Sequence, residues 1–378
     1  MDRHEGPLST HFRRLFRLVG VYNGKYITPH SCLFFFSGFV NIIYLSYILI
    51  FTDCNMTKVA HFIILQYFYI GTLWTVVYKG NDIIWIANEC DKFVGLDGHH
   101  FERLYDEVRE QEKTSPATKG KTIIDRIASI ICTWTCIEPF INAWTGKAEL
   151  EFPFTGTNAD TTKFIFIYLM QCSLMFIVAI VCSVIFKSLM GIALDLVIKY
   201  KVIGLVLSSL NEQMMNHRNV YKSDLHQTIR KCVQSHHHVL RIFEKYRDIC
   251  TYGFRYSYVG LIGATSLSRS LLSSDDPDLG TIPHIIAELS YMGFFCYILN
   301  QVEQEHDKLK DAVFAADWPW LPKPATSSLR LIMMRTAKTP RVILVKGGGP
   351  ANLETFYKLL NGTCGYLIFG LVLDQAAF

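Results

Sequence analysis

Apolar residues in this chain form long blocks that are separated by polar segments rich in lysine and arginine. A helix needs about 20 mostly apolar residues, within a range of roughly 17–25, to cross the hydrocarbon core of a bilayer. Seven blocks approach or exceed this length, so the pattern predicts an all-α, polytopic membrane protein with seven transmembrane helices. The predicted spans are 32–51, 61–78, 123–144, 164–196, 253–272, 282–302 and 353–373.

The positive charges lie almost entirely on alternate sides of these spans. Of the 37 Lys and Arg residues, 29 lie in segments 1–31, 79–122, 197–252 and 303–352, and 3 lie in connections 52–60, 145–163 and 273–281. Because short loops rich in Lys and Arg stay in the cytoplasm, the N-terminus is predicted to be cytoplasmic and the C-terminus extracellular. Asn55 begins a glycosylation acceptor, Asn-Met-Thr, in the first predicted extracellular loop.

Composition agrees with a membrane protein and argues against a soluble enzyme. Hydrophobic residues make up 50% of the 378 positions and charged residues 19%, whereas soluble domains have about 25% charged residues. The sequence has no Walker A loop, no Gly-x-Ser-x-Gly elbow and no His-Glu-x-x-His motif. We therefore expect no enzymatic activity, no cofactor, no metal and no nucleic-acid partner, and we expect membrane lipids around the helices.

Segments 79–122 and 197–252 have helical periodicity and are predicted to continue the spans below the membrane, as a platform where subunits meet. His236, His237 and His238 lie in the second of these segments. Consecutive residues on a helix point about 100° apart, so these three side chains cannot converge on one metal ion. The run is predicted to form a solvated helix face.

The C-terminal third contains motifs in a characteristic order. Asp317-Trp318-Pro319-Trp320 comes first, then Leu-Ile-Met-Met-Arg-Thr-Ala-Lys-Thr-Pro at 331–340, then Ala-Asn-Leu-Glu-Thr-Phe at 351–356 before the last span. This order resembles the insect odorant receptor family. Upstream, 295–300 is similar to the family's Cys-Tyr…Gly-Asn stretch, with Leu299 at the usual Gly position. Span number, topology and loop lengths match along the whole chain, and the N-terminal two-thirds match by pattern only.

The resemblance implies an odorant-gated, non-selective cation channel at the plasma membrane of a sensory neuron dendrite. Family members form heterotetramers with an obligate odorant co-receptor, and the last helix of each subunit lines a central pore for cations. The co-receptor has a long insertion in the second cytoplasmic loop, and the corresponding segment 197–252 lacks room for it. The resemblance therefore implies a tuning subunit, with 1–302 holding the odorant pocket and 303–378 holding a cytoplasmic anchor and the pore helix.

In the family, the odorant binds in the outer half of spans two, three, four and six. Residues at i, i+3 and i+4 share one helix face, and such faces in these spans suit a small apolar volatile. The predicted ligand-binding residues are Ile64, Tyr67, Phe68, Thr133, Cys136, Ile137, Phe140, Tyr168, Gln171, Cys172, Met175, Tyr291, Phe294 and Phe295.

The gate is expected near the outer end of the last span. With Tyr366 as the anchor of the resemblance, Phe369 and Leu373 fall on the positions that narrow the pore, and they share a helix face. Rings of apolar side chains can close a pore by dewetting. Asp374 follows at the outer mouth, where its carboxylate would concentrate cations.

Other classes of membrane protein were weighed against this interpretation. A G-protein-coupled receptor would place the N-terminus outside, which the charge distribution opposes. An insect gustatory receptor has the same topology and channel design, but its Thr-Tyr…Gln-Phe signature is absent from the last span, where Gly365-Tyr366 and Val372-Leu373 stand instead. A membrane transporter would need several intramembrane ionisable groups, and the spans offer few. The gustatory receptor channel and the transporter stay open as alternatives.

Overall fold

The computed structural model describes residues 56–92, 99–120, 185–210, 222–272, 281–315 and most of 321–362, with single positions within 8–50, within 122–130 and at 365. Its named helices are α3 (Met56–Cys90), α4 (His99–Lys113), α7 (Lys222–Leu272), α8 (Thr281–Phe314) and α9 (Lys323–Thr336). Residues 116–120, 185–210 and 353–362 are also helical. Extended pairing in these ranges is confined to one isolated antiparallel bridge, so the predicted all-α class is confirmed for the described residues.

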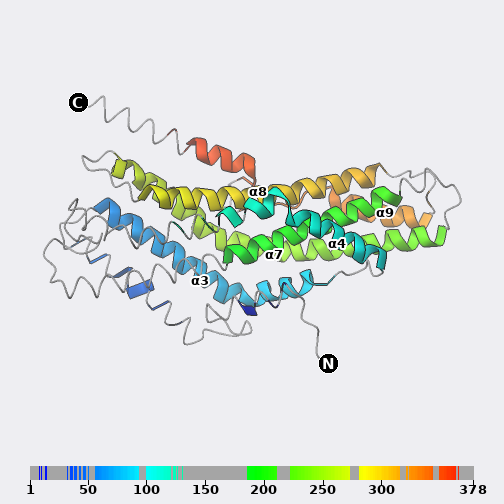
Figure 1. Cartoon of the computed structure of the whole chain (residues 1–378), viewed down its shortest axis with the longest axis horizontal. Coiled ribbons are helices and arrows are strands. Elements are labelled where there is room, and N and C mark those ends of the chain that lie inside the picture. The colour runs from blue at the N-terminus through cyan, green and yellow to red at the C-terminus, as the bar shows by residue number, and fades with distance from the viewer. Residues whose placement is uncertain are drawn as a thin grey trace.

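The long helices run side by side along the longest axis of the molecule. Figure 1 shows α3, α7 and α8 in this arrangement, with α9 at the opposite end from the start of α3. Helix α3 packs along α7, and α9 packs against both α7 and α8. Chain direction alternates, because the start of α3, the end of α7 and the start of α8 lie at the same end (Figure 1).

Several helices are longer than a bilayer is thick. The 51 residues of α7 span about 77 Å at about 1.5 Å per residue, against a hydrocarbon core of about 30 Å. Helix α3 continues from the predicted span 61–78 to Cys90, and α8 continues from the predicted span 282–302 to Phe314. The predicted helical character of segments 79–122 and 197–252 is confirmed where the structure describes them, and α3 and α7 continue from the apolar segments into these polar ones.

The polar half of α7 holds the centre of the core. Its buried residues recur at alternating spacings of three and four, which is the spacing that keeps one helix face against its neighbours. This row is Leu225, Ile229, Cys232, His236, Val239, Phe243, Tyr246 and Cys250, and Ser235, Ile242 and Ile249 are buried beside it. The 185–210 helix, α8 and α9 contribute further buried residues to the same core.

Short polar motifs fix the ends of the smaller helices. Helix α4 has Glu102 in its first turn and Lys113 in its last, which complements the helix dipole. The Ser115 hydroxyl accepts a hydrogen bond from the Thr118 amide at 3.3 Å, so Ser115 caps the 116–120 helix. The Asn352 side chain accepts one from the Thr355 amide at 3.1 Å and caps the 353–362 helix in the same way.

Helix α9 and the loop that follows it are anchored on the core. Leu329, Ile332 and Thr336 face inward from α9 and are buried. The loop then returns through an antiparallel bridge between Ile343 and Pro350, supported by the Ala351 amide, which donates to the Val342 carbonyl at 2.7 Å. This loop connects α9 to the start of the last predicted span.

Within the ranges that the structure describes, no helix contains a stretch long and apolar enough to cross a membrane. Most of the predicted span 123–144, about half of the spans 32–51 and 353–373, and residues 164–184 of the fourth lie outside the described residues. The number of spans and the orientation of the termini therefore stay predictions.

Candidate functional site

The predicted pocket residues on α3 and α8 have different surroundings. Ile64 is half-buried, and Tyr67 is 50% exposed on the surface of α3. The Tyr291 ring packs against Phe186, with ring centroids 4.7 Å apart. Phe295 is fully buried. The structure thus places Tyr291 and Phe295 in helix-packing contacts and Tyr67 at the surface, and it leaves their joint role in one pocket a prediction.

Phe294 packs where two helices meet. Its ring stacks on Tyr297, with centroids 6.1 Å apart and planes 24° apart. A Cβ at Gly120 would lie 2.7 Å from Phe294 Cε2, so glycine is what allows the ring to approach the 116–120 helix this closely. This contact connects a predicted pocket residue to the segment that precedes the third span.

The other predicted site residues fall outside the described side chains. For Phe68 the structure describes the helical backbone alone. The remaining residues lie at masked positions of the chain, namely Asn55, Thr133, Cys136, Ile137, Phe140, Tyr168, Gln171, Cys172, Met175, Tyr366, Phe369, Leu373 and Asp374.

A buried lysine fixes the end of α3. The Lys199 ammonium, 2% exposed, donates hydrogen bonds to the carbonyls of Cys90 at 2.8 Å and Lys92 at 2.9 Å. Its charge is balanced by Asp195, whose Oδ2 is 3.6 Å away, and the Tyr105 hydroxyl donates to Asp195 Oδ1 at 2.8 Å. A cation at a helix C-terminus satisfies the last carbonyls and complements the dipole, so this network joins α3, α4 and the 185–210 helix.

Three buried rings from three helices meet beside this network. Tyr200 lies 5.5 Å from His306 and 6.3 Å from His236, and the two histidine rings are 6.3 Å apart, measured between ring centroids. Among the described residues, no protein group is within hydrogen-bonding distance of the Tyr200 hydroxyl, His236 Nε2 or either nitrogen of His306. We call these three residues the Tyr–His–His cluster.

The cluster corrects the prediction that the histidine run is a solvated helix face. His236 is buried at 2% exposure, and His238 is half-buried with Nε2 3.3 Å from the Glu89 carbonyl; His237 alone is exposed. His236 lies four residues after Cys232 and three before Val239, on the buried face of α7. This spacing in the sequence indicates that His236 is buried. The described residues form no group that could hold a metal ion.

Burial keeps both histidines of the cluster neutral. Burial is the largest cause that lowers the pKa of His236 to about 3, and neighbouring His306 and His237 lower it further. Burial also lowers the pKa of His306 to about 4, against a smaller opposing effect of Asp307. The cluster is therefore uncharged at neutral pH, although its polar atoms are buried.

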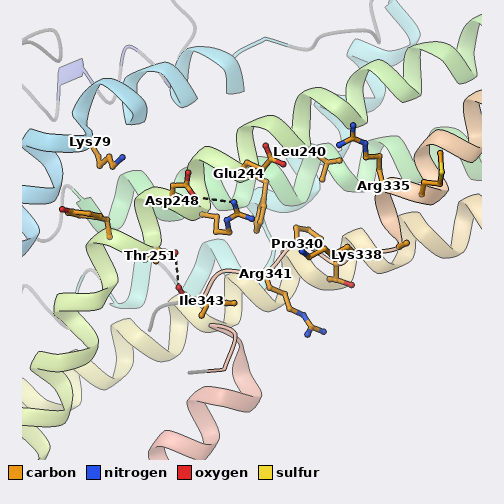
Figure 2. A pocket seen from close by; sticks show the side chains of 16 residues that line it. Lys79, Leu240, Glu244, Asp248, Thr251, Arg335, Lys338, Pro340, Arg341 and Ile343 are labelled. Carbon is orange, nitrogen blue, oxygen red and sulfur yellow. Dashed lines mark hydrogen bonds and ion pairs between the residues drawn. The ribbon is translucent and has the colours of Figure 1, made fainter. Parts of the chain in front are cut away.

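A groove with a volume of about 1180 Å³ lies between the end of α9 and the middle of α7. Figure 2 shows its walls: residues 240–252 of α7, Lys79 of α3, and the segment 334–343 that leaves α9. The Thr251 hydroxyl donates to the Ile343 carbonyl at 3.1 Å, which holds this segment beside α7. Sequence reasoning missed the groove, because its walls come from segments far apart in the chain.

One end of the groove is bordered by stacked aromatic rings. Tyr78 stacks on Tyr252 with centroids 5.6 Å apart, and Trp74 stacks on Tyr78 at 6.4 Å. The Lys79 ammonium lies 5.2 Å and 6.0 Å from the Tyr78 and Tyr252 ring centroids. Aromatic rings beside a lysine at the end of an apolar segment are typical of a membrane–water interface.

These features define an all-α protein with long helices that pack side by side. At one end of the bundle their polar segments are held together by buried polar contacts. A profile of the family described as 7tm Odorant receptor matches residues 102–364. The match covers more than half of the chain, so the chain belongs to the odorant receptor family, which is a family of membrane proteins.

Individual relatives agree with this assignment. Odorant receptor Or2 of Anopheles gambiae is 36% identical over 83 residues, a stretch that spans 22% of this chain and 22% of that relative. The insect olfactory receptor OR5 of Machilis hrabei, solved in complex with eugenol, matches with a TM-score of 0.68 at 11% identity, over 98% of this chain and 100% of that one. A further OR5 structure gives 0.70 at 10% identity, covering 97% and 99%. At such identities the likeness shows the fold.

Proposed function

We propose that this chain is the odorant-binding subunit of a heteromeric, odorant-gated, non-selective cation channel that works with the odorant co-receptor. The family profile over 102–364 is the observation that carries the proposal. The fold likeness to OR5 over nearly the whole chain supports it, because that receptor was solved with a small ligand, eugenol. The gustatory receptor and transporter alternatives gain no support from these matches.

The ligand is a small, apolar volatile that binds among the second, third, fourth and sixth spans. Transfer of apolar surface from water contributes about 25 cal/mol per Å², so a ligand of this kind is held mainly by burial. The hydroxyls of Tyr67, Tyr168 and Tyr291 are the polar groups that select one carbonyl, ester or hydroxyl on the ligand.

The receptor lies in the plasma membrane of a sensory neuron dendrite, with its N-terminus in the cytoplasm and its last helix lining the pore. The Lys and Arg distribution supports this orientation. The aromatic rings beside Lys79 support an inner membrane boundary near residue 79. Residues 1–302 hold the ligand, and 303–378 form the anchor and the pore helix within a heterotetramer with the co-receptor.

Electrical recording with and without the co-receptor tests the proposal. Cells that express this chain together with the co-receptor should give a rapid odorant-evoked cation current that needs no nucleotide or G protein. Cells that express this chain alone should give none, although the chain reaches the surface. Robust odorant currents from the chain alone would contradict the tuning-subunit assignment. Recording with a panel of odorants would also identify the ligand.

A further inference from the structure

The groove beside α7 has an excess of positive charge. Five of its lining side chains are cationic and two, Glu244 and Asp248, are carboxylates. Lys79 pairs with Asp82 at 3.7 Å, and Arg247 pairs with Asp248 at 3.5 Å. The other three cations, Arg335, Lys338 and Arg341, are exposed and make no ion pair within 4 Å with any residue that the structure describes. The Arg341 charge acts to lower the pKa of Glu303 and Glu354 outside the groove, so Arg335 and Lys338 contribute most of the excess. The groove therefore has more positive charge than its own acids balance.

The segment that bears these cations is held in place on both sides. The Thr251 hydroxyl donates to the Ile343 carbonyl, and the Thr339 hydroxyl donates to Asp307 Oδ1, each at 3.1 Å. The same segment closes an antiparallel bridge with Pro350. Because the segment is already ordered, a ligand that binds there does not have to pay the full entropic cost of ordering it.

We propose that this groove binds a multiply charged phosphate ester. Guanidinium groups match phosphate oxygens in pairs of parallel hydrogen bonds, and a cleft lined by one sign of charge concentrates the opposite sign. Phe243, Leu240 and Ile343 supply apolar surface in the same groove, which suits the ring or glycerol carbons of such an ester. A ligand with a single weak charge would leave most of the cationic excess unbalanced.

Two sources can present this chemistry, and the position of the groove is compatible with both. One end lies at the aromatic border formed by Tyr78 and Tyr252, where a phosphorylated headgroup of an inner-leaflet lipid would reach it. The other end, at Leu240 and Arg335, is about 18 Å further along α7 at about 1.5 Å per residue, where a soluble phosphate ester could enter. The lipid source rests on the proposed orientation, and the soluble source does not.

Direct binding to the full-length purified chain tests the proposal. One arm measures the affinity for soluble inositol trisphosphate in detergent; the other measures binding to phosphatidylcholine nanodiscs with and without phosphatidylinositol bisphosphate. The variant R335Q/K338Q should weaken binding at least about tenfold, because it removes two charge-assisted contacts. The matched control R230Q/K323Q removes the same charge from an exposed arginine and an exposed lysine outside the groove and should change affinity less than about twofold, since distant surface charges are screened by salt.

Each outcome decides a point. Equal affinities in the two arms identify a soluble ester as sufficient, and binding in the lipid arm alone identifies the headgroup. No binding in either arm, or equal losses in the groove variant and its control, overturns the proposal. A change in oligomeric size with R335Q/K338Q and no change in phosphate binding would show that a second subunit covers the groove, which also overturns it. The assay uses no odorant and measures no current. Its result therefore stays interpretable even if the proposed channel function is wrong.

Discussion

Lys199 donates a hydrogen bond from its buried ammonium to the backbone carbonyl of Cys90 at 2.8 Å, across 109 positions of the sequence. The same ammonium reaches the Lys92 carbonyl and the Asp195 carboxylate. One side chain thus satisfies the end of α3 and fixes it against the 185–210 helix. The Lys199 ammonium is therefore a central contact between α3 and the 185–210 helix.

Removal of this cation should destabilise the receptor strongly. The variant K199M leaves the largely buried Asp195 carboxylate, 12% exposed, without the Lys199 charge and two carbonyls without that donor, and loss of one partner of a buried pair costs about 3–5 kcal/mol. The melting temperature of the purified protein and its surface expression should both fall. The control K201M breaks the more exposed pair with Glu112, 3.0 Å apart, which should cost at most about 1 kcal/mol. Equal effects of the two variants would refute the role of Lys199.

Acid should destabilise the receptor through the Tyr–His–His cluster. In the unfolded chain a histidine has a pKa of about 6.5, whereas burial lowers the pKa of His236 to about 3 and of His306 to about 4. The unfolded state therefore binds more protons below pH 6.5, so stability falls as the pH decreases from about 6.5 towards these values. Between pH 7.5 and 5 the loss is at most about 2 kcal/mol per histidine, which melting curves at several pH values would measure.

The variant H236L/H306L should flatten this pH dependence, because neither position can then gain a proton. H237L is the matched control: His237 is exposed next to His236 and lowers the pKa of His236 less than burial does, so its removal should change the slope far less. An unchanged slope in H236L/H306L would mean that other groups determine the acid sensitivity.

The sequence predicts the helices well because their periodicity is local. The apolar blocks and the repeating spacing in 197–252 predict α7 and its continuation below the apolar segment. The same spacing places His236 on the buried face, yet polarity alone suggested a solvated position, which was wrong. Position in the repeat is the stronger signal here, since a neutral histidine can be buried between helices.

Contacts between segments that are far apart in the chain cannot be predicted from local periodicity. Nothing near Lys199 in the sequence shows that its ammonium reaches Cys90, because neighbouring Lys201 has the same local setting but makes a part-buried pair with Glu112. The groove likewise joins Lys79, Arg247 and Lys338, which no local spacing relates. The family motifs around Arg335 mark the segment but do not indicate that it lines a groove.

Two tyrosines test the predicted odorant pocket. Y67A and Y291A should shift odorant potency in the co-expressed channel while surface expression stays normal for Y67A, because Tyr67 is half exposed. Y291A also removes the ring packed on Phe186, so its expression should fall somewhat. Y67F separates the effect of the hydroxyl from that of the ring, since it removes only the proposed hydrogen bond to the odorant. If neither potency nor ligand preference changes in any of the three, the pocket lies elsewhere.

Epitope tags test the predicted orientation. A tag at the C-terminus should be labelled by antibody on intact cells, and a tag at the N-terminus should be labelled after permeabilisation alone. The expectation follows from the Lys and Arg asymmetry between alternate segments. The reverse labelling would exclude the proposed channel topology and the inner-leaflet source of a phosphate ligand.

The predicted gate is tested at the outer end of the last span. On the predicted pore helix, Leu373 would share a face with Phe369, and an apolar ring at this level would close the proposed pore by dewetting. L373S should therefore raise the basal leak of the co-expressed channel, and the increase should be partial because, in the proposed heteromer, the co-receptor would supply the rest of the ring. D374N should lower divalent permeation or block, since the carboxylate at the mouth no longer concentrates cations. L331S, on the exposed face of α9, is the control for a general effect of an apolar-to-polar change. If leak and ion selectivity are unchanged in L373S and D374N at normal surface levels, other residues line the pore.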